Sequence, residues 1–139
     1  MKLNKASMFA LMAVLELASD PERQLSTGEI AAKYGISTHH LAKIMRDLVH
    51  NGVVSAVRGV GGGYRFSGNA QRATLLDIIK LFETLDAENI VPLSCRSDEP
   101  VIRELQRIAN EIDDLTKAVL DTITLETALK SALTVERRE

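Results

Sequence analysis

Apolar residues recur at helical spacing along most of the chain. Between residues 5 and 18 they predict an amphipathic helix, whose expected buried stripe is Met8, Leu11, Met12, Leu15 and Ala18. The segment Ser26–Glu29, with the sequence STGE, has the form of a capping box and predicts a short second helix that ends at Gly35. Ser37 is a natural N-cap for a third helix, from Thr38 to about Asn51.

The third predicted helix has two different faces. One face is apolar and is expected to enter the core: Leu41, Ile44, Met45 and Leu48. The opposite face carries side chains that are cationic or become so on protonation: His39, Lys43, Arg46 and His50. A solvated polar face is the simplest interpretation for a surface helix. The sign of the charges also fits a surface that meets a polyanion, with Asp47 toward its margin.

A glycine-rich stretch follows this helix. Val53–Val57 predicts a strand, Tyr64–Phe66 predicts its partner, and Arg58–Gly63 becomes the turn of a hairpin. A phosphate-binding P-loop is excluded because Gly63 is followed by Tyr64 and not by Lys and Ser or Thr. Two short helices followed by a glycine-tipped hairpin are the parts of a winged helix-turn-helix. The predicted fold is therefore mainly α with a small β-hairpin.

The pattern changes after the hairpin. Thr74 starts a further helix, expected to pack on the first three through Leu75, Ile78, Ile79, Phe82 and Leu85. Residues 86–100 lose the periodicity and contain Pro92, Pro100 and Cys95, which predicts a loop. Thr124 is expected to cap a last short helix.

A strict heptad seam lies between the loop and the last helix. Its apolar positions are Val101, Leu105, Ile108, Ile112, Leu115 and Val119. The seam can dock on the chain's own core or on a partner, and nearly three heptads favour a partner. The predicted organisation is a winged helix-turn-helix domain over 1–85, a loop or sensor segment over 86–100, and a dimerisation helix with a C-terminal helix over 101–139.

Composition adds a charge asymmetry. Residues 1–70 hold eight Lys and Arg against five Asp and Glu, whereas residues 71–139 hold nine against fourteen. A basic front and an acidic back suit a chain whose first part alone meets a polyanion. No apolar run approaches the roughly 18 residues that span a bilayer, so we expect a cytoplasmic protein without a membrane partner.

The quoted segments resemble one family. The stretch ISTHHLAKIMRDLVHNGVVSAVRGVGGGYRFS is similar to the recognition-helix and wing signature of the Rrf2 family of bacterial winged-helix regulators. The matching positions are Ile36, Ser37, Leu41, Ile44, Gly52, Val53, Val54, Arg58, Gly59, Gly62, Gly63 and Tyr64. The resemblance implies a homodimer that binds duplex DNA and regulates transcription, most often as a repressor. The alternative is a protein-interaction module that keeps the fold without binding DNA. An enzyme is not expected.

The expected DNA contacts follow from this reading. The N-terminal part of a recognition helix points into the major groove, which places His39 and Lys43 near base edges and Thr38 and Arg46 nearer phosphates. The wing motif places Arg58 and Gly59 at the minor groove, although position alone favours a solvated arginine at a loop tip. Arg65, on the second strand, is expected to contact a phosphate.

Two features depart from the family pattern, one in the recognition helix and one in the cysteines. His40 stands where many members have tyrosine, and Ala42 stands where they have a glutamate that reads bases, so the preferred DNA sequence should differ. Cluster-binding members carry three cysteines before the dimerisation helix, whereas this chain has only Cys95. We therefore expect no iron–sulfur cofactor and no metal site. Cys95 is either an inert loop residue or a redox thiol, and the effector, whether small molecule or oxidant, stays open.

Overall fold

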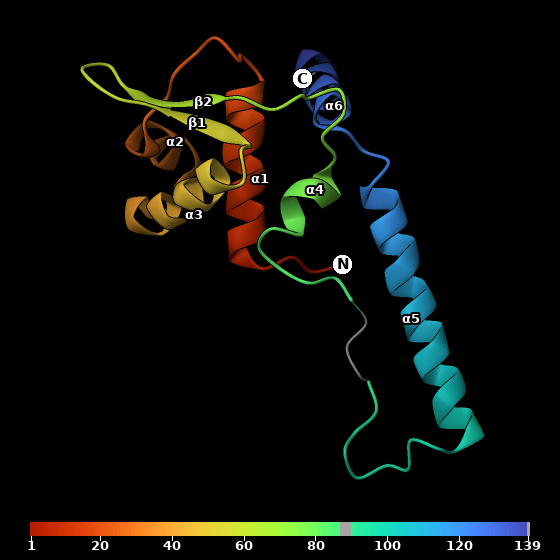
Figure 1. The fold of residues 1–139 in the computed structure, drawn as a ribbon. Coiled ribbons are helices and arrows are strands. Elements are labelled where there is room, and N and C mark those ends of the chain that lie inside the picture. Colours follow the sequence, from red (N-terminus) through yellow and green to blue (C-terminus); the bar gives the residue numbers. More distant parts are fainter. Residues whose placement is uncertain (87–89, 139) are drawn as a thin grey trace.

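A computed structural model describes residues 1–86 and 90–138 (Figure 1). In this part of the chain the elements run in the order α1 (Lys5–Ala18), α2 (Thr27–Tyr34), α3 (Thr38–His50), β1 (Val54–Val57), β2 (Gly63–Phe66), α4 (Leu75–Ile79), α5 (Pro100–Leu120) and α6 (Leu125–Arg138). The two strands form an antiparallel hairpin in which Val54 pairs with Phe66 and Val57 with Gly63. The fold is a winged helix-turn-helix with a long C-terminal helix, as the sequence predicts.

Local signals set the helix boundaries. The Ser26 hydroxyl accepts from the amide of Glu29 at 3.1 Å, and the Glu29 carboxylate accepts from the amide of Ser26 at 3.3 Å. Ser37 caps α3 through the amide of His40. Gly35 ends α2 with a φ of 68°, a left-handed conformation that favours glycine. The predicted capping box, N-cap and glycine stop are confirmed.

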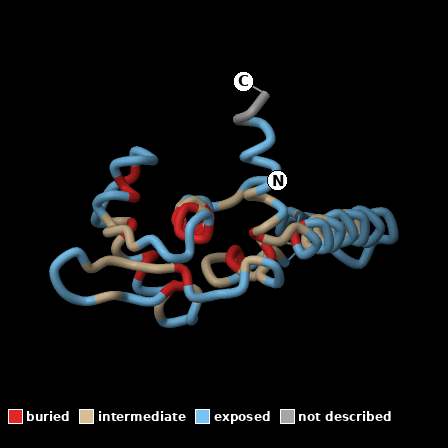
Figure 2. The backbone as a smooth tube through the Cα atoms, turned by 90° about the horizontal axis from the view of Figure 1, so that it is seen from above, coloured by how far each residue is buried: buried red, intermediate tan, exposed pale blue. Residues whose placement is uncertain are grey.

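The core surrounds α1, which contacts α3, α4 and β2. The predicted buried stripe of this helix is partly wrong. Met8 is 40% exposed, while Ala10, Ala13, Val14 and Leu17 are completely buried. The reason is tertiary, since neighbours pack on several sides of α1 and so no single stripe faces the core. Figure 2 shows the buried positions gathered around this central helix, whereas most residues of α5 are exposed and its buried residue is Leu120.

Helix α4 is shorter than its apolar pattern predicts. It begins at the Thr74 cap, as expected, but ends at Ile79 and does not continue to Leu85. Its last turn tightens, because the amides of Leu81 and Phe82 donate to carbonyls three residues back. The carbonyl of Phe82 then accepts from the side chain of Asn4, which ties the N-terminal segment to this exit.

The junction between α5 and α6 returns to the first domain. The amide of Leu75 donates to the carbonyl of Ile123 and the amide of Leu125 to the carbonyl of Ala73, both at 2.9 Å. Leu120 and Leu125 are buried in the common core. Thr124 caps α6 as predicted, but the helix extends to Arg138 and is not short.

The predicted loop over 86–100 falls partly on residues 87–89, which lie outside the described residues. Residues 90–99 form no helix or strand. No helix in residues 1–86 and 90–138 is long and apolar enough to cross a membrane.

Candidate nucleic-acid interface

Helix α3 presents a cationic face to solvent. Its apolar side is fixed in the core by Leu41, Ile44, Met45 and Leu48, each at most 3% exposed. The opposite side carries exposed residues at the positions the sequence predicts for DNA contacts: Thr38, His39, Lys43 and Arg46. Within the described part of the chain, Lys43 and Arg46 form no ion pair with a carboxylate. Their charges are therefore available to a polyanion.

The wing lies on the same side of the molecule as α3. In Figure 1 both are separated from α5 by α1. Gly59 and Gly61 have φ values of 105° and 75°, which let the tip turn back sharply. Arg58 and Gly59 are exposed at this tip, together with Val60. The structure thus brings the α3 face and the tip arginine, predicted separately, to one side.

One predicted DNA residue, Arg65, and one residue of the recognition helix, His40, contact other protein side chains. Arg65 is half-buried, and its Nη2 lies 2.9 Å from the side-chain amide oxygen of Gln24. Its assignment as a phosphate contact stays a prediction. His40 is half-buried against Phe9 of α1, with ring centroids 5.2 Å apart and planes at 74°. This edge-to-face contact helps fix α3 on α1.

A buried carboxylate that sequence reasoning missed holds the first two helices together. Glu16 is 7% exposed. It accepts from Lys33 Nζ at 2.8 and 3.0 Å, from Tyr34 Oη at 2.6 Å and from Arg23 Nη2 at 3.0 Å. A glutamate between Leu15 and Leu17, in a stretch from Met8 to Ala18 that is otherwise apolar, is the signal that could have revealed it.

These contacts shift the pKa values of Glu16 and Tyr34. Burial alone raises the pKa of the Glu16 carboxyl, but hydrogen bonds from Lys33, Tyr34 and Arg23, with the charge of Lys33, hold that pKa below its ordinary value. Burial and the contact with Glu16 raise the pKa of Tyr34 to about 12. Glu16 is therefore ionised at neutral pH and Tyr34 keeps its proton.

The heptad seam of α5 is left exposed by the described residues, 1–86 and 90–138. The predicted seam residues are 41–72% exposed: Val101, Leu105, Ile108, Ile112, Leu115 and Val119. Leu120 is the buried residue of this helix. A continuous apolar stripe left in water along a long helix is typical of a surface that a partner covers.

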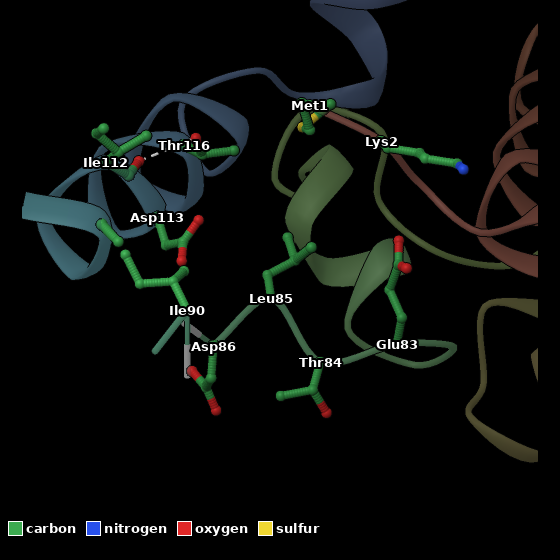
Figure 3. Close-up of a pocket in the computed structure, with 11 residues that line it drawn as sticks. Met1, Lys2, Glu83, Thr84, Leu85, Asp86, Ile90, Ile112, Asp113 and Thr116 are labelled. Carbon is green, nitrogen blue, oxygen red and sulfur yellow. Dashed lines mark hydrogen bonds between the residues drawn. The ribbon is translucent and has the colours of Figure 1, made fainter. Parts of the chain in front are cut away.

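A cleft of about 520 Å³ separates the exit of α4 from α5 (Figure 3). Leu85, Asp86, Ile90 and Asp113 contribute to its walls. Lys117 of α5 forms an ion pair with Asp86 at 2.8 Å. The cleft adjoins the predicted sensor segment. Cys95 lies in that segment and is exposed. Whether either feature meets an effector stays a prediction.

Comparison with known proteins agrees with this geometry. A helix-turn-helix, a wing and an exposed cationic face define a winged-helix DNA-binding protein. Residues 3–131 match the family model Rrf2, described as iron-dependent transcriptional regulator. The chain therefore belongs to the Rrf2 family of DNA-binding transcriptional regulators, which are not enzymes.

Individual relatives cover nearly all of the chain. The HTH-type transcriptional regulator BadM of Rhodopseudomonas palustris is 45% identical over 141 residues, which cover 100% of this chain and 87% of BadM. Among solved structures, IscR of T. potens has a TM-score of 0.75 at 27% identity, covering 95% of this chain and 88% of IscR. CymR, the global cysteine regulator of B. subtilis, has a TM-score of 0.74 at 30% identity, covering 94% of this chain and 98% of CymR.

The donor atoms of this chain do not fit the iron that the family description names. An iron–sulfur cluster is normally held by several cysteine thiolates, and Cys95 is the single cysteine of the sequence. Across residues 1–86 and 90–138, no three His, Cys, Asp or Glu side chains gather as a metal site. His39, His40 and His50 all belong to α3, far along the chain from Cys95.

Proposed function

We propose that this protein is a sequence-specific transcription repressor that binds duplex DNA as a homodimer in the cytoplasm. The observation that carries the proposal is the placement of the exposed α3 cations and the wing on one side of α1, with the uncovered α5 seam on the other. One side meets DNA and the other meets the second copy.

The groove assignments follow from the exposed residues. Helix α3 enters the major groove, where Lys43 donates to guanine O6 and N7 and His39 lies near a neighbouring base edge. Thr38 and Arg46 contact phosphates. Arg58 and Gly59 reach the adjacent minor groove, whose narrow A·T-rich stretches attract arginine.

Two observations support the dimer: the exposed seam of α5, and the need to place two α3 helices in successive major grooves of the DNA. Six exposed apolar residues along α5 form a self-complementary stripe that a second α5 covers. Two copies related by a two-fold axis place two α3 helices in successive major grooves, so the operator is a near-palindrome.

Gel-shift assays against genomic fragments test the proposal. The wild-type protein is expected to retain a small set of fragments at near-physiological salt. Arg58→Ala should weaken this binding by about 1–3 kcal/mol, and Lys43→Ala should also relax the base preference. Lys130→Ala, which removes an exposed cation from α6, is the matched control and should leave affinity unchanged.

Two results would contradict the proposal. Retention of no fragment over random DNA would favour the alternative, a protein-interaction module that keeps the winged-helix fold. Binding by Arg58→Ala and Lys43→Ala equal to that of Lys130→Ala would leave DNA binding in place and refute the groove assignments. The direction of regulation is read separately, from reporter transcription with and without the protein, and activation would refute the repressor role.

A further inference from the structure

The connector between α1 and α2 pairs with the outer side of β2 through an isolated β-bridge between Leu25 and Tyr64. The amide of Leu25 donates to the carbonyl of Tyr64 at 3.0 Å, and the amide of Tyr64 donates to the carbonyl of Leu25 at 2.7 Å. A Cβ atom on Gly63 would lie 2.5 Å from the Leu25 carbonyl oxygen. Glycine at 63 is therefore needed for this close approach, and β2 is held on both of its sides.

The side chain of Gln24 ties this connector to the tip of the wing. The side-chain amide of Gln24 is oriented so that both its nitrogen and its oxygen form hydrogen bonds. The nitrogen donates to the carbonyl of Gly61 at 3.1 Å. Its oxygen accepts from Arg65 Nη2 at 2.9 Å. One side chain thus bridges a tip glycine and a guanidinium on β2. Arg65 Nε is buried and has no partner among the described residues, which places this part of the guanidinium inside the wing.

The connector is itself anchored to the first helix. Arg23 Nη2 donates to the backbone carbonyl of Glu16 at 3.1 Å and to its carboxylate at 3.0 Å. A line of contacts therefore runs from α1 through Arg23 and Gln24 to Gly61. The tip that carries Arg58 is a closed loop, since the amide of Gly62 donates to the carbonyl of Gly59 at 3.0 Å. Holding Gly61 consequently limits where Arg58 points.

We propose that Gln24 is a positioning residue for DNA recognition, which fixes the glycine-rich wing tip so that Arg58 meets the minor groove while α3 occupies the major groove. This inference rests on the proposed function. Four glycines between 59 and 63 make the tip flexible, and a flexible tip must be ordered when it binds. Gln24 orders it beforehand, with Arg65 acting inside the protein as the partner of Gln24.

A double-mutant cycle on a retained operator fragment tests the role. Gln24→Ala should bind about tenfold more weakly than wild type, on the scale of a lost preorganised contact. Combined with Arg58→Ala, it should weaken binding no further, because its effect acts through Arg58. Gln71→Ala, at an exposed glutamine of the same domain, is the control and should bind as wild type does.

Footprinting gives a readout that general destabilisation would not move. Gln24→Ala should lose hydroxyl-radical protection at the minor-groove positions of the wing and keep methylation protection of major-groove guanines under α3. Gln24→Glu retains an acceptor for Arg65 but lacks the donor to Gly61, so it should lose the same minor-groove protection in a protein whose packing is kept.

The results separate this inference from the proposed function. Wild-type affinity for Gln24→Ala, or losses for Gln24→Ala and Arg58→Ala that multiply in the double variant, overturns the positioning role while DNA binding stands. Equal loss of protection in both grooves also overturns it. Failure of the wild-type protein to bind any duplex overturns the proposed function first.

Discussion

Replacing Glu16 by Gln should destabilise the helix-turn-helix in a pH-dependent way. The substitution keeps the shape of the side chain and removes the charge that Lys33 and Arg23 face at 2.8 and 3.0 Å. Hydrogen bonds to charged groups contribute about 1.5–3 kcal/mol net. The side chains of Lys33 and Arg23 are 59% and 40% exposed, so water recovers much of their share. We expect Glu16→Gln to lower the free energy of unfolding by about 1–2 kcal/mol at pH 7.

The pH dependence has a definite sign. The pKa of Glu16 is lowered in the folded protein from an ordinary value of 4.5, so its contribution is present above that value. It is lost as the pH falls through the lowered folded pKa. The difference between wild type and Glu16→Gln should therefore shrink as the pH falls below about 4.

Urea unfolding curves at pH 7 and at about pH 3.5 measure this difference. Glu22→Gln is the matched control, because Glu22 is an exposed glutamate in the connector between α1 and α2, beside Arg23, and the variant should give wild-type curves. The reasoning would be refuted if Glu16→Gln unfolded like Glu22→Gln at pH 7. It would also be refuted if the loss at pH 7 persisted undiminished at the lower pH.

Further predictions concern the seam, the wing and the sensor segment. Ile108→Asp places a charge at the middle of the exposed seam and should give monomers by sedimentation; surviving dimers would exclude this face as the interface. Gly63→Ala forces the Leu25 carbonyl away and should lower the thermal midpoint and weaken DNA binding, and unchanged values of both would contradict the close approach. Anaerobically purified protein should hold far less than one iron per chain, and near-stoichiometric iron with thiolate-to-iron absorption would overturn that expectation. Cys95→Ser should bind DNA like wild type in reducing buffer, because Cys95 lies outside α3 and the wing; weaker binding would contradict this.

The sequence predicts the elements well where their causes are local. The capping residues Ser26, Ser37 and Thr74 act within three residues of themselves, and Gly35 ends α2 through its own backbone conformation. The cationic face of α3 is likewise visible from periodicity alone. What that face binds is not visible there, because a solvated helix carries the same pattern.

The sequence fails where distant segments meet. The core-facing residues of α1 depend on neighbours packed on several sides of it, so Met8 is exposed against expectation. The partners of Glu16 come from a connector and from α2, up to 18 residues away. Gln24 reaches a wing tip more than thirty residues further along the chain. No spacing rule connects such positions.

In the proposed dimer, the distance between the two α3 helices depends on how each α5 is joined to its own winged domain. Among the described residues the junction is compact, since the Thr74 hydroxyl caps α4 and also donates to the Asp121 carboxylate at 3.1 Å. The backbone of Leu75 bonds that of Ile123 beside it. The cleft between the exit of α4 and α5 is lined in part by Asp86, and Asp86 forms an ion pair with Lys117 of α5. In the proposed dimer, we therefore expect a conformational change in the segment after α4 to shift α5 relative to the winged domain. Such a shift would change the distance between the two α3 helices, and it requires no iron cluster.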